Sequence, residues 1–304
     1  MTERYRLMEA EKGSFPVGMM ARLLGVSRSG FYAWLSGPRG EAADPWARER
    51  AAVAEAHASL DGIPGARTLL AIARRDFPGI TLYRVRKLMR ELGIRGVCPN
   101  ASKRTTVPDP AAPARPDLIR RDFDRPVPTC WLVGDITYLR TGQGWLYMAV
   151  VIDLCTRMVV GLSFSERMTA ELPIAALECA WRRGYVAAGA VFHSDRGSQY
   201  TSRAMAEWAA AREVRLSCGR TGSCRDNAVA ESFFGTFKNE WYHRFPHATR
   251  AEARAASVGY IEGYYNRRRP HTSIGNAAPA DKMGAFMARM DAIAKLEEGM
   301  PIAA

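Results

Sequence analysis

Apolar residues recur at helical spacing in the first third of the chain. Short segments with apolar positions three and four residues apart run near 17–24, 28–36, 44–59, 66–75 and 81–92. Glycine or proline separates these segments, for example at Gly25, Pro38, Pro64 and Pro78. The pattern predicts an all-helical region over residues 1–95.

The next stretch has few apolar residues and many prolines. Residues 99–116 read PNASKRTTVPDPAAPARP and contain five prolines. Proline cannot continue a helix or a central strand, and a polar, proline-rich segment is typically extended. We therefore expect a linker over residues 96–120.

Beyond the linker, β-branched and other apolar residues form short runs bounded by turns. Runs over 131–139, 145–153 and 156–164 predict three strands in an antiparallel meander. The elements predicted after them are a helix over 170–183, a strand over 189–193, a helix over 201–212, a strand over 213–217, and helices over 228–242 and 249–265. This is the element order of the ribonuclease-H-like α/β fold. We place such a core, with a mixed five-stranded sheet and a C-terminal helix, over residues 121–285, and a tail over 286–304.

The excess of basic over acidic residues indicates the class of molecule that the protein binds. The 304-residue chain has a formal net charge of +12 and an isoelectric point near 9.7. Residues 1–120 hold 20 basic and 12 acidic residues, so +8 of the excess lies in the first two-fifths of the chain. Such an excess attracts nucleic acid. The six cysteines form no C-x-x-C pair, which argues against a zinc cluster or a disulfide framework.

We expect a soluble, cytoplasmic protein that associates with the nucleoid. The sequence has no run of eighteen uninterrupted apolar residues, so it predicts no membrane segment. The N-terminus is charged and lacks the apolar core of a signal peptide.

Residues 15–34 have the spacing of a helix-turn-helix, with a glycine turn at Gly25 and a cap at Ser27. The predicted core of this motif is Leu23, Leu24, Val26, Phe31 and Leu35. Arg28, Ser29 and Tyr32 would then face outward and contact DNA. The same pattern also occurs in helical hairpins that bind no DNA, and the basic charge is what favours DNA here.

Three acids interrupt apolar surroundings in the predicted core. Asp135 lies in the first strand, Asp195 follows the fourth strand directly, and Glu231 lies in the first turns of the helix over 228–242. In this fold the first and fourth strands are neighbours, so the two aspartates can converge. Clustered carboxylates need cations, and Mg²⁺ prefers oxygen ligands. Two such ions, with Mn²⁺ able to substitute, could activate an attacking oxygen and stabilise the leaving oxygen of a phosphodiester.

The helix that carries Glu231 has two distinct faces. Glu231, Gly235 and Lys238 share one face, and the other face is apolar. A glycine between an acid and a lysine would let a DNA backbone come close, so we expect Lys238 to contact DNA. Asp226 or Asn227 is expected to cap this helix, and Asn227 is also a candidate DNA contact. Further candidate phosphate contacts are Arg86, Lys87, Arg267 and Arg268, although each could equally belong to an ordinary solvated surface.

Several motifs of the chain resemble one known family. They are 131–138 (WLVGDITY), 147–153 (YMAVVID), 193–200 (HSDRGSQY), 222–234 (GSCRDNAVAESFF), 238–240 (KNE) and 260–271 (YIEGYYNRRRPH). Weaker matches are 24–34 (LGVSRSGFYAW) and 83–90 (YRVRKLMR). These motifs resemble the DDE transposases of bacterial insertion sequences, which have a retroviral-integrase-like core, and in particular the second-frame product of the IS-three family. Thirty-five residues lie between Asp195 and Glu231, which is the spacing of that family.

The resemblance implies an activity and partners. It implies that Asp135, Asp195 and Glu231 form a metal-binding catalytic triad for DNA cleavage and strand transfer, and so for DNA integration. It implies DNA partners, namely the element ends and the target, self-association in a synaptic complex, and an upstream-frame protein or a frameshifted fusion with it. The alternatives are a ribonuclease-H-like nuclease that only hydrolyses and a non-catalytic DNA-binding regulator.

Overall fold

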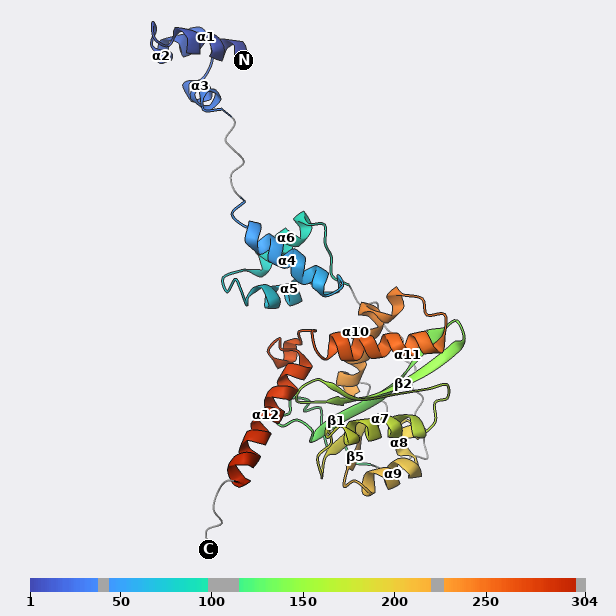
Figure 1. The fold of residues 1–304 in the computed structure, drawn as a ribbon. Helices are drawn as coiled ribbons and strands as arrows, with labels where there is room; N and C mark the ends of the chain where they lie inside the picture. Colours follow the sequence, from blue (N-terminus) through green and yellow to red (C-terminus); the bar gives the residue numbers. More distant parts are fainter. Residues whose placement is uncertain (38–43, 98–114, 220–226, 299–304) are drawn as a thin grey trace. The chain divides into compact units, whose positions relative to one another are not determined.

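The computed structural model describes residues 1–37, 44–97, 115–219 and 227–298, without the side chains of 293–298. The chain divides into two compact units, Met1–Ala51 and Ala52–Ala304. Figure 1 shows the helical N-terminal elements and the α/β core. Most of the predicted linker lies outside the described residues, as does Asp226.

The first unit contains three helices, α1 (Thr2–Glu11), α2 (Val17–Leu23) and α3 (Arg28–Leu35). The turn after α2 contains Gly25 at φ +62°, a conformation that favours glycine. Ser27 caps α3 as predicted, since its hydroxyl accepts the Gly30 N–H at 2.9 Å. The described residues of this unit thus include the helix, turn and capped second helix expected from the sequence.

The core of this unit differs from the one predicted. Phe31 is fully buried, and Leu24 and Val26 pack against the core, but Leu23 and Leu35 are exposed. The reason is α1, which the apolar pattern did not predict. It contributes Tyr5 and Met8 to the core, and the Tyr5 ring lies 6.2 Å from that of Phe31 and 5.9 Å from that of Trp34.

Three more helices precede the sheet. They are α4 (Ala47–Ser59), which spans the boundary between the units, α5 (Ala66–Ala73) and α6 (Leu82–Glu91). The Thr81 hydroxyl caps α6 by accepting the Arg84 N–H at 3.2 Å. The apolar side of α6 is buried through Val85, Leu88 and Met89. These bounds agree with the helical segments expected from the sequence.

A mixed five-stranded sheet forms the centre of the second unit. Its strands are β1 (Trp131–Thr141), β2 (Gly144–Asp153), β3 (Val159–Ser165), β4 (Val191–Ser194) and β5 (Arg215–Cys218). Their order is β3-β2-β1-β4-β5. The β1–β2 and β2–β3 pairs are antiparallel, whereas β1–β4 and β4–β5 are parallel. The predicted meander and the ribonuclease-H-like class are confirmed.

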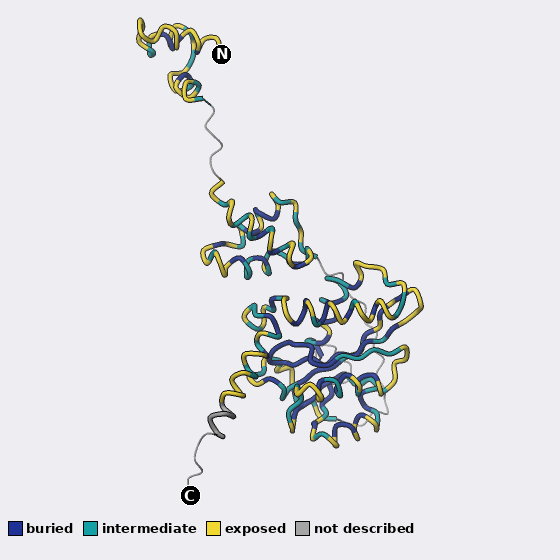
Figure 2. The backbone as a smooth tube through the Cα atoms, viewed as in Figure 1, coloured by how far each residue is buried: buried dark blue, intermediate teal, exposed yellow. Residues whose placement is uncertain are grey.

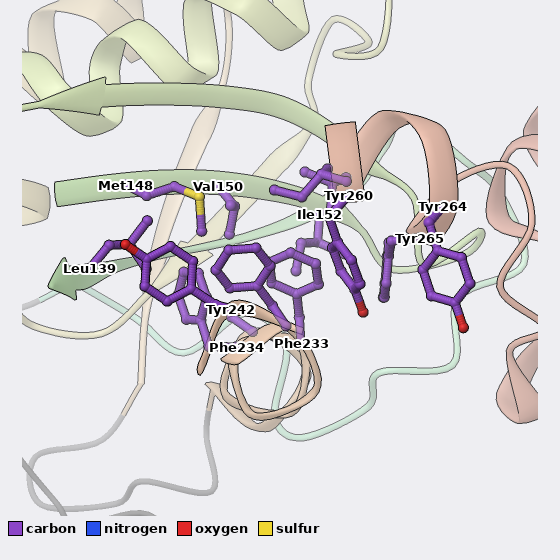
Figure 3. Close-up of a cluster of buried hydrophobic side chains, with 14 of the residues drawn as sticks. Leu139, Met148, Val150, Ile152, Phe233, Phe234, Tyr242, Tyr260, Tyr264 and Tyr265 are labelled. Atoms are coloured by element: carbon purple, nitrogen blue, oxygen red, sulfur yellow. The ribbon is translucent and has the colours of Figure 1, made fainter. Parts of the chain in front are cut away.

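Helices cover both faces of this sheet. On one face lie α7 (Glu171–Arg182), α8 (Ser198–Thr201) and α9 (Arg203–Ala210), packed over residues such as Leu132, Val151 and Phe192. On the other face lie α10 (Ala228–Glu240), α11 (Arg250–Val258) and the π-helix η3 (Gly259–Tyr265). Figure 2 shows the strands as buried along most of their length, and Figure 3 shows Phe233 and Phe234 of α10 pointing toward the strands.

Three helix boundaries differ from the sequence prediction. The helix expected over 201–212 is two helices, because Ser202 is extended and caps α9 through the Met205 N–H. The helix expected over 249–265 is α-helical only to Val258 and continues as η3. Residue 285, where the core was expected to end, falls inside α12 (Pro279–Glu298).

Gly161 on β3 provides a test of the packing of α7 on the sheet. A Cβ at residue 161 would collide with the Ala176 carbonyl oxygen of α7, whose backbone cannot move away cheaply. We expect Gly161→Ala to lower the free energy of unfolding by roughly 1–3 kcal/mol, the usual cost of overpacking. The measurement is chemical denaturation of the full chain.

Gly284→Ala is the matched control, because Gly284 lies within α12 and a Cβ added there would meet nothing within 4 Å. That change should be neutral or stabilising by about 0.5–1 kcal/mol, as expected for a mid-helix glycine. Equal stability of Gly161→Ala and the wild type would show that α7 does not pack on β3 in this way.

Candidate active site

The parallel pairing of β1 and β4 brings two aspartates together. Val133 on β1 is paired with His193 on β4. Asp135 is two residues after Val133, and Asp195 is two residues after His193. The two aspartates therefore lie beside each other, because neighbouring strands are typically about 4.8 Å apart. Asp135 is still within β1, whereas Asp195 is the first residue after β4. The sequence prediction that these two acids converge is thus met by the strand register.

The two carboxylates have few compensating contacts among the described residues. The Ile136 N–H donates to Asp135 Oδ1 at 2.8 Å, and the Gly197 N–H donates to Asp195 Oδ1 at 3.0 Å. Burial raises the pKa of Asp135 to about 8, and the charge of Asp195 contributes to this rise. Burial also raises the pKa of Asp195. Two acids with raised pKa values in one place are typical of a functional site.

Glu231 is not as close to the two aspartates as they are to each other. It is exposed in the first turn of α10, and its charge contributes to the raised pKa of Asp135. Among the described residues, no three His, Cys, Asp or Glu side chains are close enough to hold a metal ion. The structure therefore brings Asp135 and Asp195 together and places Glu231 on the helix beside them.

Two buried contacts fix the strand next to Asp135. Gly134 lies against the ring of Phe192, and a Cβ at residue 134 would collide with that ring. On the other side, Asn227 Nδ2 donates to the Gly134 carbonyl at 3.1 Å. Asn227 stands at the N-cap position of α10, but its side chain makes no capping bond, which corrects the expected cap. Its side chain is buried and ties the start of α10 to β1.

Lys238 faces the aspartates from the same helix as Glu231. Its Nζ lies 4.5 Å from the centre of the Tyr138 ring. Burial lowers the pKa of Lys238, and the charge of Asp135 opposes this effect. Gly235, one turn before it, has nothing within 4 Å of an added Cβ. On the expected face of α10, Glu231 is therefore exposed and Gly235 has open space around it, whereas Lys238 is half-buried against Tyr138.

The other predicted DNA contacts lie at several places on the two units. In the first unit Arg28, Ser29 and Tyr32 are exposed on α3. In the second unit Arg86, Arg267 and Arg268 are exposed, and Lys87 is partly buried with its Nζ 3.9 Å from Glu91. None of these residues belongs to the acid site, and their contact with DNA stays a prediction.

Arg269, the third arginine of the 267–269 run, has a structural role that the sequence did not reveal. It donates to both carboxylate oxygens of Glu240, at 3.0 and 2.7 Å. The Tyr260 hydroxyl donates to the same carboxylate at 3.3 Å. This pairing joins the end of α10 to the segment after η3.

Sequence reasoning also gave no role to Tyr200, the last residue of the HSDRGSQY motif. Its side chain is buried on α8, in the same core cluster as Phe192. His193 was likewise unassigned, and it is buried with Nδ1 at 2.8 Å from the Ser217 hydroxyl of β5. The motif itself was a signal for both residues, but it did not indicate what either contacts.

A ribonuclease-H-like sheet with one acid on its first strand and another directly after its fourth strand defines a class, the polynucleotidyl transferases with an integrase core. Comparison with protein families agrees: two models described as "Integrase core domain" match residues 126–224 and 212–279. Within the described residues, no helix is long and apolar enough to span a bilayer.

Two relatives that are encoded by insertion elements show which family of this class the chain is similar to. The chain is 35% identical over 264 residues to an uncharacterised 31 kDa protein of insertion element IS600 from Shigella sonnei, covering 86% of this chain and 96% of that protein. It is 34% identical over 279 residues to transposase InsF of insertion sequence IS3A from Escherichia coli, covering 91% and 96%. The chain belongs to the IS3 (IS-three) family of DDE transposases.

Solved integrases are more distant neighbours. The HTLV-2 integrase catalytic core in complex with magnesium is 16% identical, with a TM-score of 0.40, and the match covers 50% of this chain and 95% of that one. A chain of the simian T-cell lymphotropic virus intasome is 14% identical, with a TM-score of 0.45, and the match covers 75% and 72%.

The raised pKa of Asp135 predicts how stability depends on pH without divalent cations. The folded chain keeps a proton on Asp135 up to about pH 8, whereas the unfolded chain releases it near pH 4. The folded state therefore binds more protons between these values, and the free energy of unfolding should fall as pH rises from about 4 to 8. Asp135→Asn should weaken this decline and melt at a higher temperature than the wild type at pH 8.

The measurement is thermal melting in EDTA at pH 5, 6, 7 and 8. Asp124→Asn is the control, because Asp124 is exposed and lies outside the acid pair. Parallel curves for Asp135→Asn and the wild type would show that the Asp135 carboxylate is not held in a protonated state by its surroundings.

Proposed function

We propose that this transposase cleaves DNA and transfers strands with Asp135, Asp195 and Glu231 as its metal-binding catalytic triad. The observation that supports this most strongly is the register of β1 and β4, which sets Asp135 beside Asp195 at one place in the sheet. The exposed Glu231 on α10 would complete an oxygen-only ligand set once a cation draws it toward the two aspartates.

The donor set fits Mg²⁺. Burial raises the pKa values of both aspartates, and the charge of Asp195 adds to the rise at Asp135, so a cation that replaces their protons would relieve an unfavourable burial of charge. When bound, two Mg²⁺ ions supply activation of an attacking oxygen and stabilisation of the leaving oxygen at a phosphodiester. We infer that Mn²⁺ can substitute, since it accepts the same oxygen ligands.

The chain's own residues would position the DNA around this chemistry. One oxygen of Asp135 and one of Asp195 accept from backbone N–H groups, and the second oxygen of each carboxylate would bind the cation. The gap at Gly235 gives the backbone of a donor end room to approach, and the Lys238 ammonium lies where it can pair with a phosphate. Water or a 3′-hydroxyl would then attack the phosphorus in line with the leaving oxygen.

Binding of the element ends is assigned to the helical modules. The helix-turn-helix presents Arg28, Ser29 and Tyr32 on its exposed side, as a recognition helix does. Exposed Arg86 and the exposed pair Arg267 and Arg268 add positive charge for phosphates, with Lys87 beside its Glu91 partner. For Asn227, its buried bond to Gly134 supports a role in holding α10 rather than in touching DNA.

Assembly and location follow from the family. Cutting and joining two element ends requires both to be held together, so we infer self-association in a synaptic complex on DNA in the bacterial cytoplasm. We further infer that an upstream-frame protein, or a frameshifted fusion with it, takes part. A purely hydrolytic nuclease would share the acid site, and a strand-transfer assay with a 3′-hydroxyl donor end separates the two activities.

Conservative changes of the acids test the proposed triad. Asp135→Asn, Asp195→Asn and Glu231→Gln keep side-chain volume but remove a charged metal ligand, so each should lower cleavage and strand transfer by more than about a hundredfold in Mg²⁺, while duplex binding is kept. Activity is measured on labelled terminal-repeat DNA, and binding by mobility shift. Glu213→Gln, outside the site, is the control. Wild-type activity in any one of the three variants would remove that residue from the triad.

The open face of α10 provides an independent test. Gly235→Leu should leave thermal melting level or raise it, because it replaces a mid-helix glycine in open space, worth about 0.5–1 kcal/mol. Strand transfer should nevertheless fall, since the leucine would block the approaching backbone. Lys238→Ala should also lower strand transfer, by about tenfold, through loss of a charged phosphate contact.

Gly235→Ala serves as the size control and should have the smaller effect on strand transfer. A sharp drop in melting temperature for Gly235→Leu would mean that residue 235 is packed. Unchanged melting and unchanged strand transfer together would mean that DNA does not approach this face of α10.

A further inference from the structure

Tyr200 has a buried hydroxyl that none of the described residues binds. The side chain is 2% exposed, and its Oη has no hydrogen-bond partner in the described part of the chain. Burying a hydroxyl without a partner costs free energy, so such groups usually serve a ligand, an ion or a water. The fold gives no reason to choose tyrosine over phenylalanine at this place.

The surroundings of Tyr200 place it in the acid site. Its N–H donates to the Gly197 carbonyl at 3.0 Å, and the Gly197 N–H donates to Asp195 Oδ1 at 3.0 Å. The turn that carries Tyr200 is therefore attached to one of the aspartates. From the other side, Arg115 Nη1 donates to the Tyr200 carbonyl at 2.6 Å, so both backbone polar groups of this residue are held.

The ring of Tyr200 also packs, through Phe192, against the strand that carries Asp135. Its centroid lies 5.9 Å from that of Phe192, and Phe192 lies against Gly134, the residue before Asp135. Burial raises the pKa of Tyr200 well above its ordinary value, and the charges of Asp135 and Asp195 raise it further. The hydroxyl therefore stays protonated and can act as a hydrogen-bond donor beside two acids.

We propose that Tyr200 is a positioning residue of the acid pair, whose hydroxyl donates a hydrogen bond to a water ligand of the cation that Asp135 and Asp195 bind. This rests on the proposed function. Neither carboxylate accepts a hydrogen bond from Oη, although the charges of both raise the pKa of this hydroxyl. The acceptor in this proposal is therefore an oxygen that arrives with the ion. Mg²⁺ usually keeps several of its waters in protein sites, and groups that bind such ligands orient them.

The competing interpretation is that Tyr200 only fills space beside Phe192. The two interpretations predict different results for Tyr200→Phe, which removes one oxygen and keeps the ring. If Tyr200 has a positioning role, Tyr200→Phe should bind the cation about tenfold more weakly or worse, as is usual when a residue that orients a metal ligand is changed. A positioning role also predicts a melting temperature in EDTA that is unchanged or higher, because the variant no longer buries an unbonded hydroxyl.

Tyr242→Phe is the matched control. The Tyr242 hydroxyl is equally part of a buried ring, but it donates to the Arg140 carbonyl at 3.0 Å. Its removal should lower the melting temperature in EDTA and leave cation binding unchanged. The two variants should thus differ from each other on both measurements.

The experiment titrates the full chain with Mn²⁺ in the absence of DNA and follows the free ion by electron paramagnetic resonance. Wild-type Mn²⁺ affinity in Tyr200→Phe would overturn the proposal, and so would a fall in its metal-free melting temperature like that of Tyr242→Phe. Asp135→Asn separates this from the proposed function. Mn²⁺ binding that survives Asp135→Asn would contradict the triad itself, whereas binding lost in Asp135→Asn but kept in Tyr200→Phe would remove only the role of Tyr200.

Discussion

The burial of two neighbouring carboxylates is the constraint around which the second unit is built. Asp135 and Asp195 lie side by side because β1 and β4 run parallel in adjacent positions, and a parallel pair requires a crossover connection. The chain makes that crossover through β2, β3 and α7, so the core is organised around the pairing of two strands far apart in sequence. Burial at this place raises the pKa values of both acids, and the charge of Asp195 adds to the rise at Asp135.

Such an arrangement persists only if the rest of the fold holds it in place. On one face, the Phe192 ring packs against Gly134, where any side chain would collide. On the other face, Asn227 ties α10 to the same strand, and Phe233 and Phe234 anchor that helix in an aromatic core (Figure 3). The end of α10 is fixed by the Glu240–Arg269 pair. Glu231 and Lys238 thus stand on a helix secured at both ends, while the space at Gly235 between them stays open.

Much of this could be predicted from the sequence, because apolar runs and the order of elements report directly on burial. The meander, the placement of the fourth strand beside the first and the convergence of Asp135 with Asp195 follow from those patterns and from the element order of the fold. Contacts between distant segments could not be read in the same way. The three arginines at 267–269 look alike in sequence, yet it is Arg269 that meets Glu240. Asn227 looks like a helix cap but donates to Gly134 instead.

The helix-turn-helix shows the same limit. Leu23 and Leu35 fit the apolar spacing but are exposed, because α1 supplies Tyr5 and Met8 to the core. The sequence of α1 has no clear apolar stripe, so its contribution was not predicted. Tyr200 belongs to a recognisable motif, but only the fold shows that its hydroxyl is buried without a partner among the described residues.

The central claim is that the two strand-borne aspartates and Glu231 form one cation site. Its most direct test is an anomalous difference map from crystals of the full chain grown with Mn²⁺ and an element end. The account predicts a manganese peak between the carboxylates of Asp135 and Asp195, with Glu231 as a further ligand. A well-ordered acid site without a peak, or manganese bound only at other residues, would contradict it.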